Sequence, residues 1–440
     1  MTKILELIHR FTWGIPALVL ILGVGIFLSL RTGFPQLGLL KASFRQFFTA
    51  LRGREGSFQS LCTALAATVG TGNLVGVAGA ICIGGPGSIF WMWVSGFFGM
   101  ATKFAEATLA VHYREKTAGG FRGGPMYMIT GGMGDRFRWM AKFYCLLGLF
   151  ASFGVGNAAQ INAVVTGING LAQKDVSLLA GVVLAGLIGC VLFGGAKRIG
   201  QIAEMLVPAM SGTYILLCVG VLALRHDAIG QAFSSIFRGA FAPKAVTGGM
   251  IGSCFLVLRT GCSRGVFTNE AGMGTASIAH GGANVSHPVQ QGLMGIMEVF
   301  LDTIVICTLT ALVILCSGVP VPYGDDVGGK LTADAFNAVY GSWAEVFLTV
   351  ALGCFAFATV LGWGLYGGRC AEFLFGPKGW KGFSLTQILV VLLGATARTE
   401  AVWAFSETLN GLMAIPNLIL LTALSPTLRR LTIDYKKSGS

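Results

Sequence analysis

Long apolar stretches separated by short polar loops run along almost the entire chain. Most of these stretches are long enough to cross the hydrocarbon core of a bilayer as helices. We therefore predict an all-α, polytopic membrane protein with about eleven membrane-spanning helices. They are expected at Gly14–Leu30, Phe58–Ile83, Ser88–His112, Phe143–Leu171, Val176–Gly194, Ile199–Leu224, Thr247–Ala279, Gln290–Ser317, Ala344–Gly368, Leu385–Ala397 and Val402–Leu424.

The second of these stretches is interrupted at its centre by small and polar residues. It reads TALAATVGTGNLVGVAG, and Gly70 and Gly72 allow the backbone to leave helical geometry. Backbone groups freed in this way are tolerated at membrane depth only where protein or a water-filled cavity satisfies them. We predict a discontinuous helix at 59–83 that forms a ligand site near the membrane midplane. A helix-packing face formed by Gly72 and Gly76 is the alternative interpretation.

A second interrupted stretch lies five spans later, at 247–279, and ends in the sequence TNEAGMG. Two interrupted segments at corresponding positions of two halves are typical of transporters built from inverted repeats. We predict a single transporter domain over 1–440. It comprises an extra N-terminal helix at 14–30, two inverted repeats of five spans at 59–224 and 247–424, and a cytoplasmic tail at 425–440.

Positive charge is concentrated in alternate loops, which hold most of the 31 lysines and arginines. One loop on the opposite side is acidic and contains Asp325, Asp326 and Asp334. Because basic loops remain on the cytoplasmic side, we predict an outside N-terminus and a cytoplasmic C-terminus. The same asymmetry explains the net charge of +12 without a nucleic-acid partner.

The composition supports the membrane assignment. Hydrophobic residues make up 54% of the chain and charged residues 11%, whereas about 25% of a typical soluble domain is charged. The 11 cysteines are scattered singly through apolar stretches. We interpret them as small core residues rather than as metal or redox ligands.

Polar residues inside predicted spans are candidate site residues, because burying them in a bilayer is costly. Asn157 and Gln160 lie three residues apart on one helix face, where they either contact a ligand or tie helices together. Thr359 and Trp363 also share a face. The indole ring either stacks over a small substrate or packs in the core.

Several charged residues also fall inside predicted spans. Lys103 and Glu106 are three residues apart and are expected to pair near a cytoplasmic helix end. Arg264 and Glu270 flank the second interruption, which they either brace or gate. Asp302 is a candidate proton- or cation-binding group.

Enzyme motifs are weak in this chain. Gly261, Ser263 and Gly265 match G-x-S-x-G, but that motif requires a strand-turn-helix in an α/β sheet rather than a membrane span. The sequence contains no HExxH motif and no Walker loop, and its five histidines form no ligand cluster. We therefore expect neither enzymatic activity nor coupling to ATP within this chain.

Five motifs distributed over nearly the whole chain resemble those of the alanine/glycine:cation symporter family, also called sodium:alanine symporters. They read TALAATVGTGNLVGVAGAI, GGPGSIFWMWVSGFFGMATKFAEATLAVHYR, GGPMYMI, FTNEAGMGTASIAH and TVLGWGLYGGRC. This resemblance implies the leucine-transporter fold, with five-plus-five inverted repeats and one extra helix.

The resemblance also implies roles for individual residues. The substrate carboxylate is expected at the amides of Thr71 and Gly72. Other substrate contacts are expected from Gln160, Thr359 and Trp363, and from Thr260, Gly261, Cys262 and Ser263 of the second interruption. One sodium ion is expected at the carbonyls of Ala66 and Val69 with Thr359, and a second cation at the Thr68 carbonyl and the Asn73 side chain.

These roles imply sodium-coupled import of alanine or glycine by alternating access, with sodium as the coupling ion and no other cofactor. Two alternatives stay open. The first is a proton-coupled carrier or exchanger of another small amino acid. The second is a membrane enzyme or a sensor that binds a ligand without transporting it.

Overall fold

The computed structural model describes residues 14–53, 56–117, 120–325, 327–396 and 399–438. These residues form helices apart from one short hairpin, whose strands are β1 (Glu115–Thr117) and β2 (Gly120–Arg122). The first half of the chain contains α2 (Ile15–Thr32), α3 (Pro35–Gly38), α4 (Leu40–Gly53), α5 (Gly56–Thr68), η1 (Gly72–Gly76), α6 (Val77–Gly84), α7 (Ser88–His112), α8 (Pro125–Met128), η2 (Ile129–Met133), η3 (Asp135–Phe137), α9 (Arg138–Phe153), η4 (Gly154–Ala158), α10 (Ala159–Ala172), α11 (Ser177–Leu192) and α12 (Gly195–Leu224).

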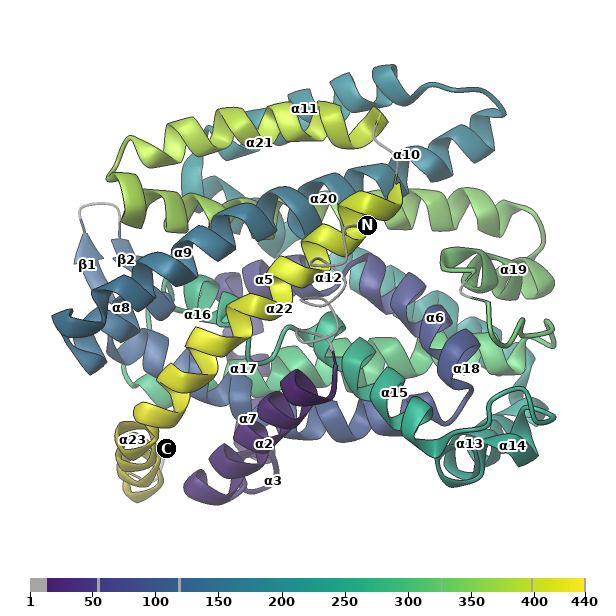
Figure 1. Ribbon diagram of the computed structural model, residues 1–440, viewed down its shortest axis with the longest axis horizontal. Helices are drawn as coiled ribbons and strands as arrows, with labels where there is room; N and C mark the ends of the chain where they lie inside the picture. Colours follow the sequence, from purple (N-terminus) through teal and green to yellow (C-terminus); the bar gives the residue numbers. More distant parts are fainter. Residues whose placement is uncertain (1–13, 54–55, 118–119, 326, 397–398, 439–440) are drawn as a thin grey trace.

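The second half continues the helical bundle. It contains α13 (His226–Phe241), α14 (Pro243–Val246), α15 (Cys254–Asn269), α16 (Thr275–His280), α17 (Pro288–Val299), η5 (Phe300–Cys307), α18 (Thr308–Cys316), α19 (Gly329–Tyr340), α20 (Trp343–Phe375), α21 (Gly379–Thr396), α22 (Thr399–Ala423) and α23 (Ser425–Lys437). Figure 1 shows α11 and α21 side by side along one edge, while the β-hairpin and α13 lie at opposite ends of the bundle.

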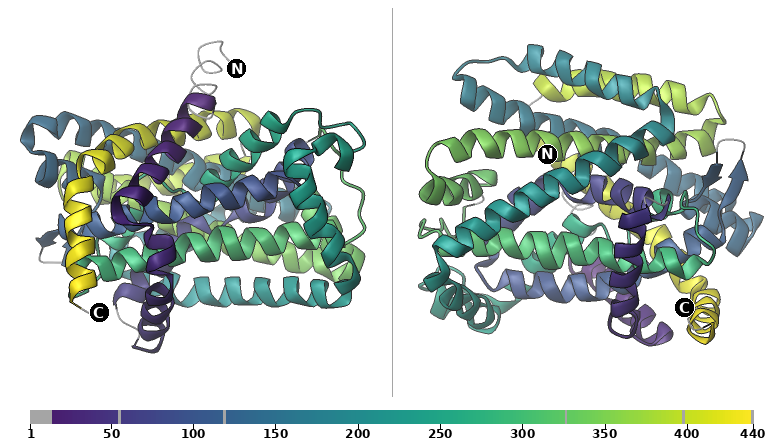
Figure 2. Two further views of the ribbon diagram at one scale, coloured as in Figure 1. Left: turned by 90° about the horizontal axis from the view of Figure 1, so that it is seen from below. Right: turned by 180° about the vertical axis from the view of Figure 1, so that it is seen from behind.

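Two long helices, α7 and α20, organise the interior. Helix α7 packs against α15 and α17, and α20 packs against α5, α9, α10 and α12. The back view in Figure 2 shows α12 running obliquely across the bundle. The two discontinuous helices are thereby enclosed by continuous ones, which hold the breaks in place.

Five helical segments of the described chain are long and apolar enough to cross a membrane. Two bent helix pairs raise this number to seven. The all-helical, polytopic architecture that the sequence predicts is therefore confirmed, while the full set of eleven spans and their orientation stay predictions.

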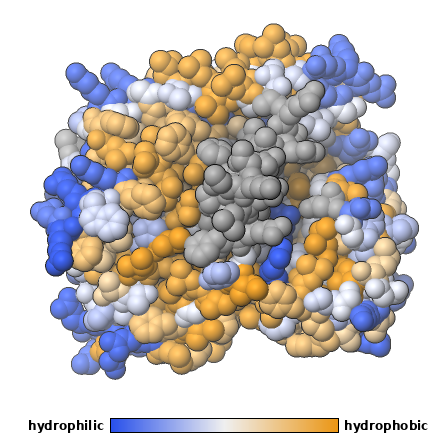
Figure 3. Space-filling view, in the orientation of Figure 1, coloured by the Kyte–Doolittle hydropathy of each residue, from blue (hydrophilic) through white to orange (hydrophobic). Residues whose placement is uncertain are grey.

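The surface has the distribution of polar and apolar residues that is expected for a protein embedded in a bilayer. In Figure 3, hydrophobic residues dominate the upper and lower parts of the view, and hydrophilic residues gather towards its left and right edges. Large apolar side chains are exposed on helices that line the outside of the bundle, among them Leu178, Leu187, Leu216, Val350 and Leu393. Such exposure is favourable where lipid rather than water surrounds the helices.

The first discontinuous helix lies where the sequence predicts it. Helix α5 ends at Thr68, η1 begins at Gly72, and the helical axes on the two sides of the break differ by 53°. The Gly70 amide donates to the Asn73 side chain at 2.9 Å, so it is not available to the carbonyl that a continuous helix would use. Local side-chain bonding thus replaces the helical ladder at this point.

The second break lies within the predicted stretch 247–279, but after the residues that are expected to contact the substrate. Thr260–Ser263 belongs to the continuous helix α15, and the interruption occurs at Glu270–Gly274 before α16 begins. Gly272 and Gly274 have φ values of +95° and +83°, which only glycine adopts without strain. The glycines within α15 serve another purpose, since a β-carbon at Gly261 would overlap the Ser88 carbonyl oxygen of α7.

Candidate functional site

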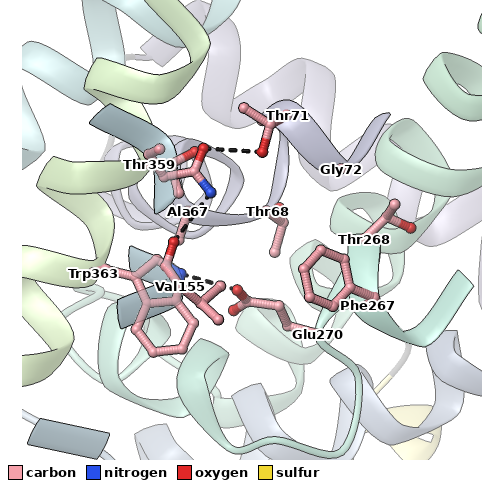
Figure 4. Close-up of a pocket in the computed structure, with 12 residues that line it drawn as sticks. Ala67, Thr68, Thr71, Gly72, Val155, Phe267, Thr268, Glu270, Thr359 and Trp363 are labelled. Carbon is pink, nitrogen blue, oxygen red and sulfur yellow. Dashed lines mark hydrogen bonds between the residues drawn. The ribbon is translucent and has the colours of Figure 1, made fainter. Parts of the chain in front are cut away.

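A small cavity lies between the two breaks (Figure 4). Its volume, taken as the space that the centre of a water molecule can occupy, is about 20 Å³. This is enough for a single ordered water. The cavity walls come from both breaks and from α5, η1, η4, α10, α15 and α20. The lining residues are Ala67, Thr68, Gly70, Thr71, Gly72, Val155, Gln160, Phe267, Thr268, Glu270, Thr359 and Trp363.

One wall is formed by the beginning of the second half-helix. Thr71 is the N-cap of η1 and Gly72 is its first residue. The Thr71 hydroxyl donates to Gln160 Oε1 at 3.0 Å, and Gln160 Nε2 donates to the Val155 carbonyl at 3.1 Å. A helix N-terminus presents amide donors and partial positive charge, so this wall suits an anionic group.

Glycine allows close packing at two positions of this break. A β-carbon at Gly70 would lie 2.6 Å from Thr359 Oγ1, and one at Gly72 would lie 3.2 Å from Thr268 Cγ2. The first contact brings α20 against the break, and the second brings the end of α15 against it. Any larger residue would push these elements away from the cavity.

The opposite wall carries a carboxylate. Glu270 adopts a left-handed backbone conformation with φ of +53°, and its side chain is buried. Oε1 accepts from Trp363 Nε1 at 3.0 Å and Oε2 accepts from Thr275 Oγ1 at 2.8 Å. Figure 4 shows Glu270 and Thr71 on opposite sides of the cavity. The site therefore has amide donors at one end and a carboxylate at the other.

Glu106 holds the second break from the neighbouring helix α7. Its Oε1 accepts from the amides of Gly272 and Gly274, each at 3.0 Å, and from Asn417 Nδ2 at 2.8 Å. All three donors bind Oε1, whereas Oε2 is buried without a hydrogen-bond partner. Glu106 does not form the ion pair with Lys103 that the sequence predicts, because Lys103 pairs with Glu298.

Lys103 instead reaches across to α17. Its Nζ lies 2.7 Å from Glu298 Oε1, and His280 Nε2 lies 2.9 Å from Glu298 Oε2. Lys103 and His280 are fully buried. A lysine without an acidic neighbour at that depth would carry a large desolvation cost, so this contact joins α7, α16 and α17 firmly.

Asp302 joins the two breaks. Its Oδ1 accepts from Asn73 Nδ2 at 2.7 Å, and its Oδ2 accepts from Thr303 Oγ1 at 2.9 Å. Asn269 Nδ2, at the end of α15, donates to the Thr303 hydroxyl at 3.1 Å. The buried Asp302 carboxylate therefore contacts the first broken helix directly, through Asn73, and the second indirectly, through Thr303 and Asn269.

The structure places six of the thirteen predicted site residues around the cavity. The predicted residues that line the cavity are Thr68, Thr71, Gly72, Gln160, Thr359 and Trp363. Ala66, Val69 and Asn73 are buried at the first break but do not line the cavity. Asn73 lies within reach of it through its bond to the Gly70 amide.

The four predicted residues of α15 lie elsewhere. Thr260 packs against Gly84 of α6, Gly261 against α7, and the Cys262 thiol contacts the Trp91 carbonyl at 3.6 Å. Ser263 does not line the cavity either. Helix α15 is continuous at Thr260, Gly261, Cys262 and Ser263, which places these residues away from the cavity. Substrate contacts from them stay a prediction.

The predicted substrate and sodium ligands leave out six lining residues, although Gly70 and Glu270 are noted in the sequence as parts of the two interruptions. The six are Ala67, Gly70, Val155, Phe267, Thr268 and Glu270. A signal existed for the last three, because they begin the FTNEAGMG sequence, in which two closely spaced glycines follow a charged residue inside a span. Apolar Ala67 and Val155 carry no such signal.

Of the two polar pairs that the sequence places on shared helix faces, Asn157 and Gln160 separate, whereas Thr359 and Trp363 both line the cavity. Gln160 faces the cavity, whereas Asn157 Nδ2 donates to the Gln387 carbonyl of α21 at 2.8 Å. Asn157 belongs to the π-helical segment η4, whose wider turn moves it off the face of Gln160. Trp363 both lines the cavity and packs tightly on Gly156, while Thr359 contacts Gly70.

Comparison with known proteins agrees with this geometry. The model of the sodium:alanine symporter family matches residues 1–440. The chain is 43% identical over 433 residues to the sodium/alanine symporter AgcS of Methanococcus maripaludis, covering 96% of this chain and 94% of that protein. It is 38% identical over 431 residues to the amino-acid carrier protein AlsT of Bacillus subtilis, covering 97% and 90%.

The fold is also that of a solved transporter. The crystal structure of MhsT in complex with L-phenylalanine matches with a TM-score of 0.58 at 14% identity, over 85% of this chain and 97% of that one. At this identity the match establishes a leucine-transporter-like fold, while the sequence matches establish the family. The chain therefore belongs to the sodium:alanine symporter family and is a membrane carrier of amino acids rather than an enzyme.

Proposed function

We propose that this chain imports alanine or glycine together with sodium by alternating access across a bacterial inner membrane. The observation that carries the proposal is the cavity between the two breaks, with amide donors on one wall and a carboxylate on the other. This pattern of charge complements a small zwitterion. Trp363 and the close contacts at Gly70 and Gly72 leave no room for a large side chain.

The substrate carboxylate lies at the amides of Thr71 and Gly72 in this proposal. The N-terminus of the half-helix formed by η1 and α6 supplies both hydrogen-bond donors and a favourable dipole. Gln160 holds the Thr71 hydroxyl, which orients this wall before a substrate arrives. Thr359 and Trp363 then enclose the rest of the molecule.

Sodium occupies two positions around the first break. The carbonyls of Ala66 and Val69 bind one ion with the Thr359 hydroxyl, which lies against Gly70. The Thr68 carbonyl and the Asn73 side chain bind the second. Asp302 supports the second position, because its carboxylate contacts Asn73 and brings a negative charge close to the ion.

The predicted eleven spans organise this site as two inverted repeats, 59–224 and 247–424, preceded by the helix at 14–30 and followed by the tail at 425–440. The leucine-transporter-like fold supports this division. So does the presence of one discontinuous helix near the start of each half. Five spans per repeat give opposite orientations in the membrane, with the N-terminus outside and the C-terminus cytoplasmic.

Transport requires the broken helices to move. Thr71, Glu270 and Trp363 are buried, so a substrate enters only after one side of the cavity opens. The breaks provide the hinges, since their backbone is not held by a continuous helical ladder. Sodium and the substrate carboxylate bind close together, so each raises the affinity for the other.

Reconstituted proteoliposomes test the proposal. An imposed inward sodium gradient should drive accumulation of labelled alanine above equilibrium, and glycine should compete. Accumulation driven equally well by a pH gradient without sodium would favour the proton-coupled alternative. Saturable alanine binding with no flux under either gradient would indicate a non-transporting sensor.

A further inference from the structure

The buried charges around the two breaks do not balance. In the described part of the chain, four carboxyl groups are buried, on Glu106, Glu270, Glu298 and Asp302, and Lys103 is the only buried lysine or arginine. Lys103 and His280 both contact Glu298. No described lysine, arginine or histidine forms an ion pair with the other three carboxyl groups. Buried charges without partners are costly, so this region is suited to receive cations.

Only one of the three carboxyl groups lines the cavity. Glu106 faces the backbone of the second break, and Asp302 faces Asn73 and Thr303. Glu270 lines the cavity directly, across from Thr71 and Gly72 (Figure 4). A cation that enters the cavity as part of the substrate therefore meets Glu270.

The Glu270 carboxylate is oriented but not saturated. Each of its oxygens accepts one hydrogen bond, from Trp363 and from Thr275, and both donors are neutral. A carboxylate oxygen has two acceptor positions, so a further donor can bind each of them. The left-handed backbone of Glu270 is strained for a residue with a side chain, which is consistent with a functional constraint at this position.

We propose that Glu270 binds the ammonium group of the substrate and thereby restricts the carrier to amino acids over hydroxy acids and simple carboxylic acids. This inference rests on the proposed function, in which Thr71 and Gly72 bind the carboxylate of the same substrate. A charge-assisted N–H···O bond to a buried carboxylate is among the strongest hydrogen bonds in proteins. A hydroxy acid offers only a neutral O–H donor and a simple carboxylic acid offers none, so either ligand leaves the buried negative charge of Glu270 uncompensated.

The substrate's charges are then matched at both ends. The carboxylate meets the helix N-terminus, and the ammonium meets Glu270 on the opposite wall. Sites built to hydrogen-bond a substrate N–H discriminate strongly against an analogue that lacks it. L-lactate and propionate, which keep the carboxylate and have nearly the size of alanine, are the informative analogues.

The test uses the purified full-length protein and Glu270→Gln. Glutamine has the size of glutamate and keeps an acceptor for Trp363, but it removes the negative charge. Competition against labelled alanine at saturating sodium gives the affinities for alanine, L-lactate and propionate. The variant is expected to bind alanine roughly 10- to 100-fold more weakly, while its affinity for L-lactate is unchanged or higher. The preference for alanine over L-lactate should therefore fall by at least about tenfold.

Glu106→Gln is the matched control. It also removes a buried carboxylate that contacts the second break, but Glu106 does not line the cavity. Its ratio of alanine to L-lactate affinity should equal that of the wild type even if both affinities decline. Glu270→Asp keeps the charge and should retain the preference for alanine, which covers the case in which Glu270→Gln does not fold.

Two results would overturn the inference. One is an unchanged alanine affinity in Glu270→Gln. The other is a loss of alanine affinity with the wild-type ratio of alanine to L-lactate, which would mean that Glu270 only braces the break. Failure of the proposed function is separate, because it would appear as absence of sodium-dependent alanine binding by the wild type itself.

Discussion

Asn73 connects the first broken helix to Asp302 of η5. Its side-chain nitrogen lies 2.7 Å from Asp302 Oδ1, and its side-chain oxygen accepts the Gly70 amide at 2.9 Å. One amide side chain therefore satisfies the backbone of the break and contacts a buried carboxylate. The break and the carboxylate are coupled at the position where we place a cation.

Replacing Asn73 with alanine should abolish sodium-coupled uptake. The change leaves the Gly70 amide and the Asp302 carboxylate without this partner, at a cost of about 1–3 kcal/mol for each buried group. Uptake of labelled alanine into proteoliposomes measures the effect, and size-exclusion chromatography confirms that the variant is folded. Wild-type uptake by Asn73→Ala would disprove the cation position at this residue.

Gly72→Ala should weaken alanine binding about tenfold, because the new β-carbon would press on Thr268 Cγ2 at 3.2 Å and overpacking costs about 1–3 kcal/mol. Thr268→Ser removes that methyl group and keeps the hydroxyl that donates to the Gly265 carbonyl. The double variant should recover most of the lost affinity. If Thr268→Ser gives no recovery, the close approach of the two breaks is not the cause.

The glycines of α15 should affect folding rather than substrate affinity. Gly261→Ala is expected to reduce the yield of folded protein, because its β-carbon would overlap the Ser88 carbonyl of α7. Ser263→Ala should leave the alanine KM at the wild-type value. A severalfold change in KM for Ser263→Ala would indicate that this part of α15 does contribute to the binding site.

Lys103→Met should strongly destabilise the protein. Removing one partner of a buried ion pair typically costs about 3–5 kcal/mol, because the other charge stays buried. Thermal denaturation followed by tryptophan fluorescence should show a clearly lower Tm. The exposed Lys437 provides the control, since surface substitutions usually change stability by less than about 0.5 kcal/mol. Equal Tm values for Lys103→Met and for the same substitution at Lys437 would contradict a stabilising role of the Lys103–Glu298 pair.

The first break could be predicted from sequence because its signal is local. Gly70, Gly72 and Asn73 interrupt an otherwise apolar stretch, and the Asn73 side chain bonds to the backbone three residues away. The second break is harder to place, because α15 contains glycines that serve helix packing. The positive φ values that interrupt the chain there belong to Glu270, Gly272 and Gly274, whereas no glycine within α15 has one.

Partners from other helices could not be predicted from sequence spacing. Lys103 and Glu106 share a helix, but Lys103 contacts α17 and Glu106 contacts the second break. The role of Glu270 depends on Trp363, which lies far along the chain. Spacing identifies residues that can meet on one helix, while tertiary packing decides which contacts form.

Alanine binding measured by isothermal titration calorimetry, at increasing sodium concentrations and constant ionic strength, tests the central claim most directly. If the cavity holds the amino acid beside a sodium ion, the alanine affinity should rise with sodium, and alanine should raise the sodium affinity by the same factor. Choline should not substitute for sodium. An alanine affinity that is the same in sodium and in choline would contradict the account.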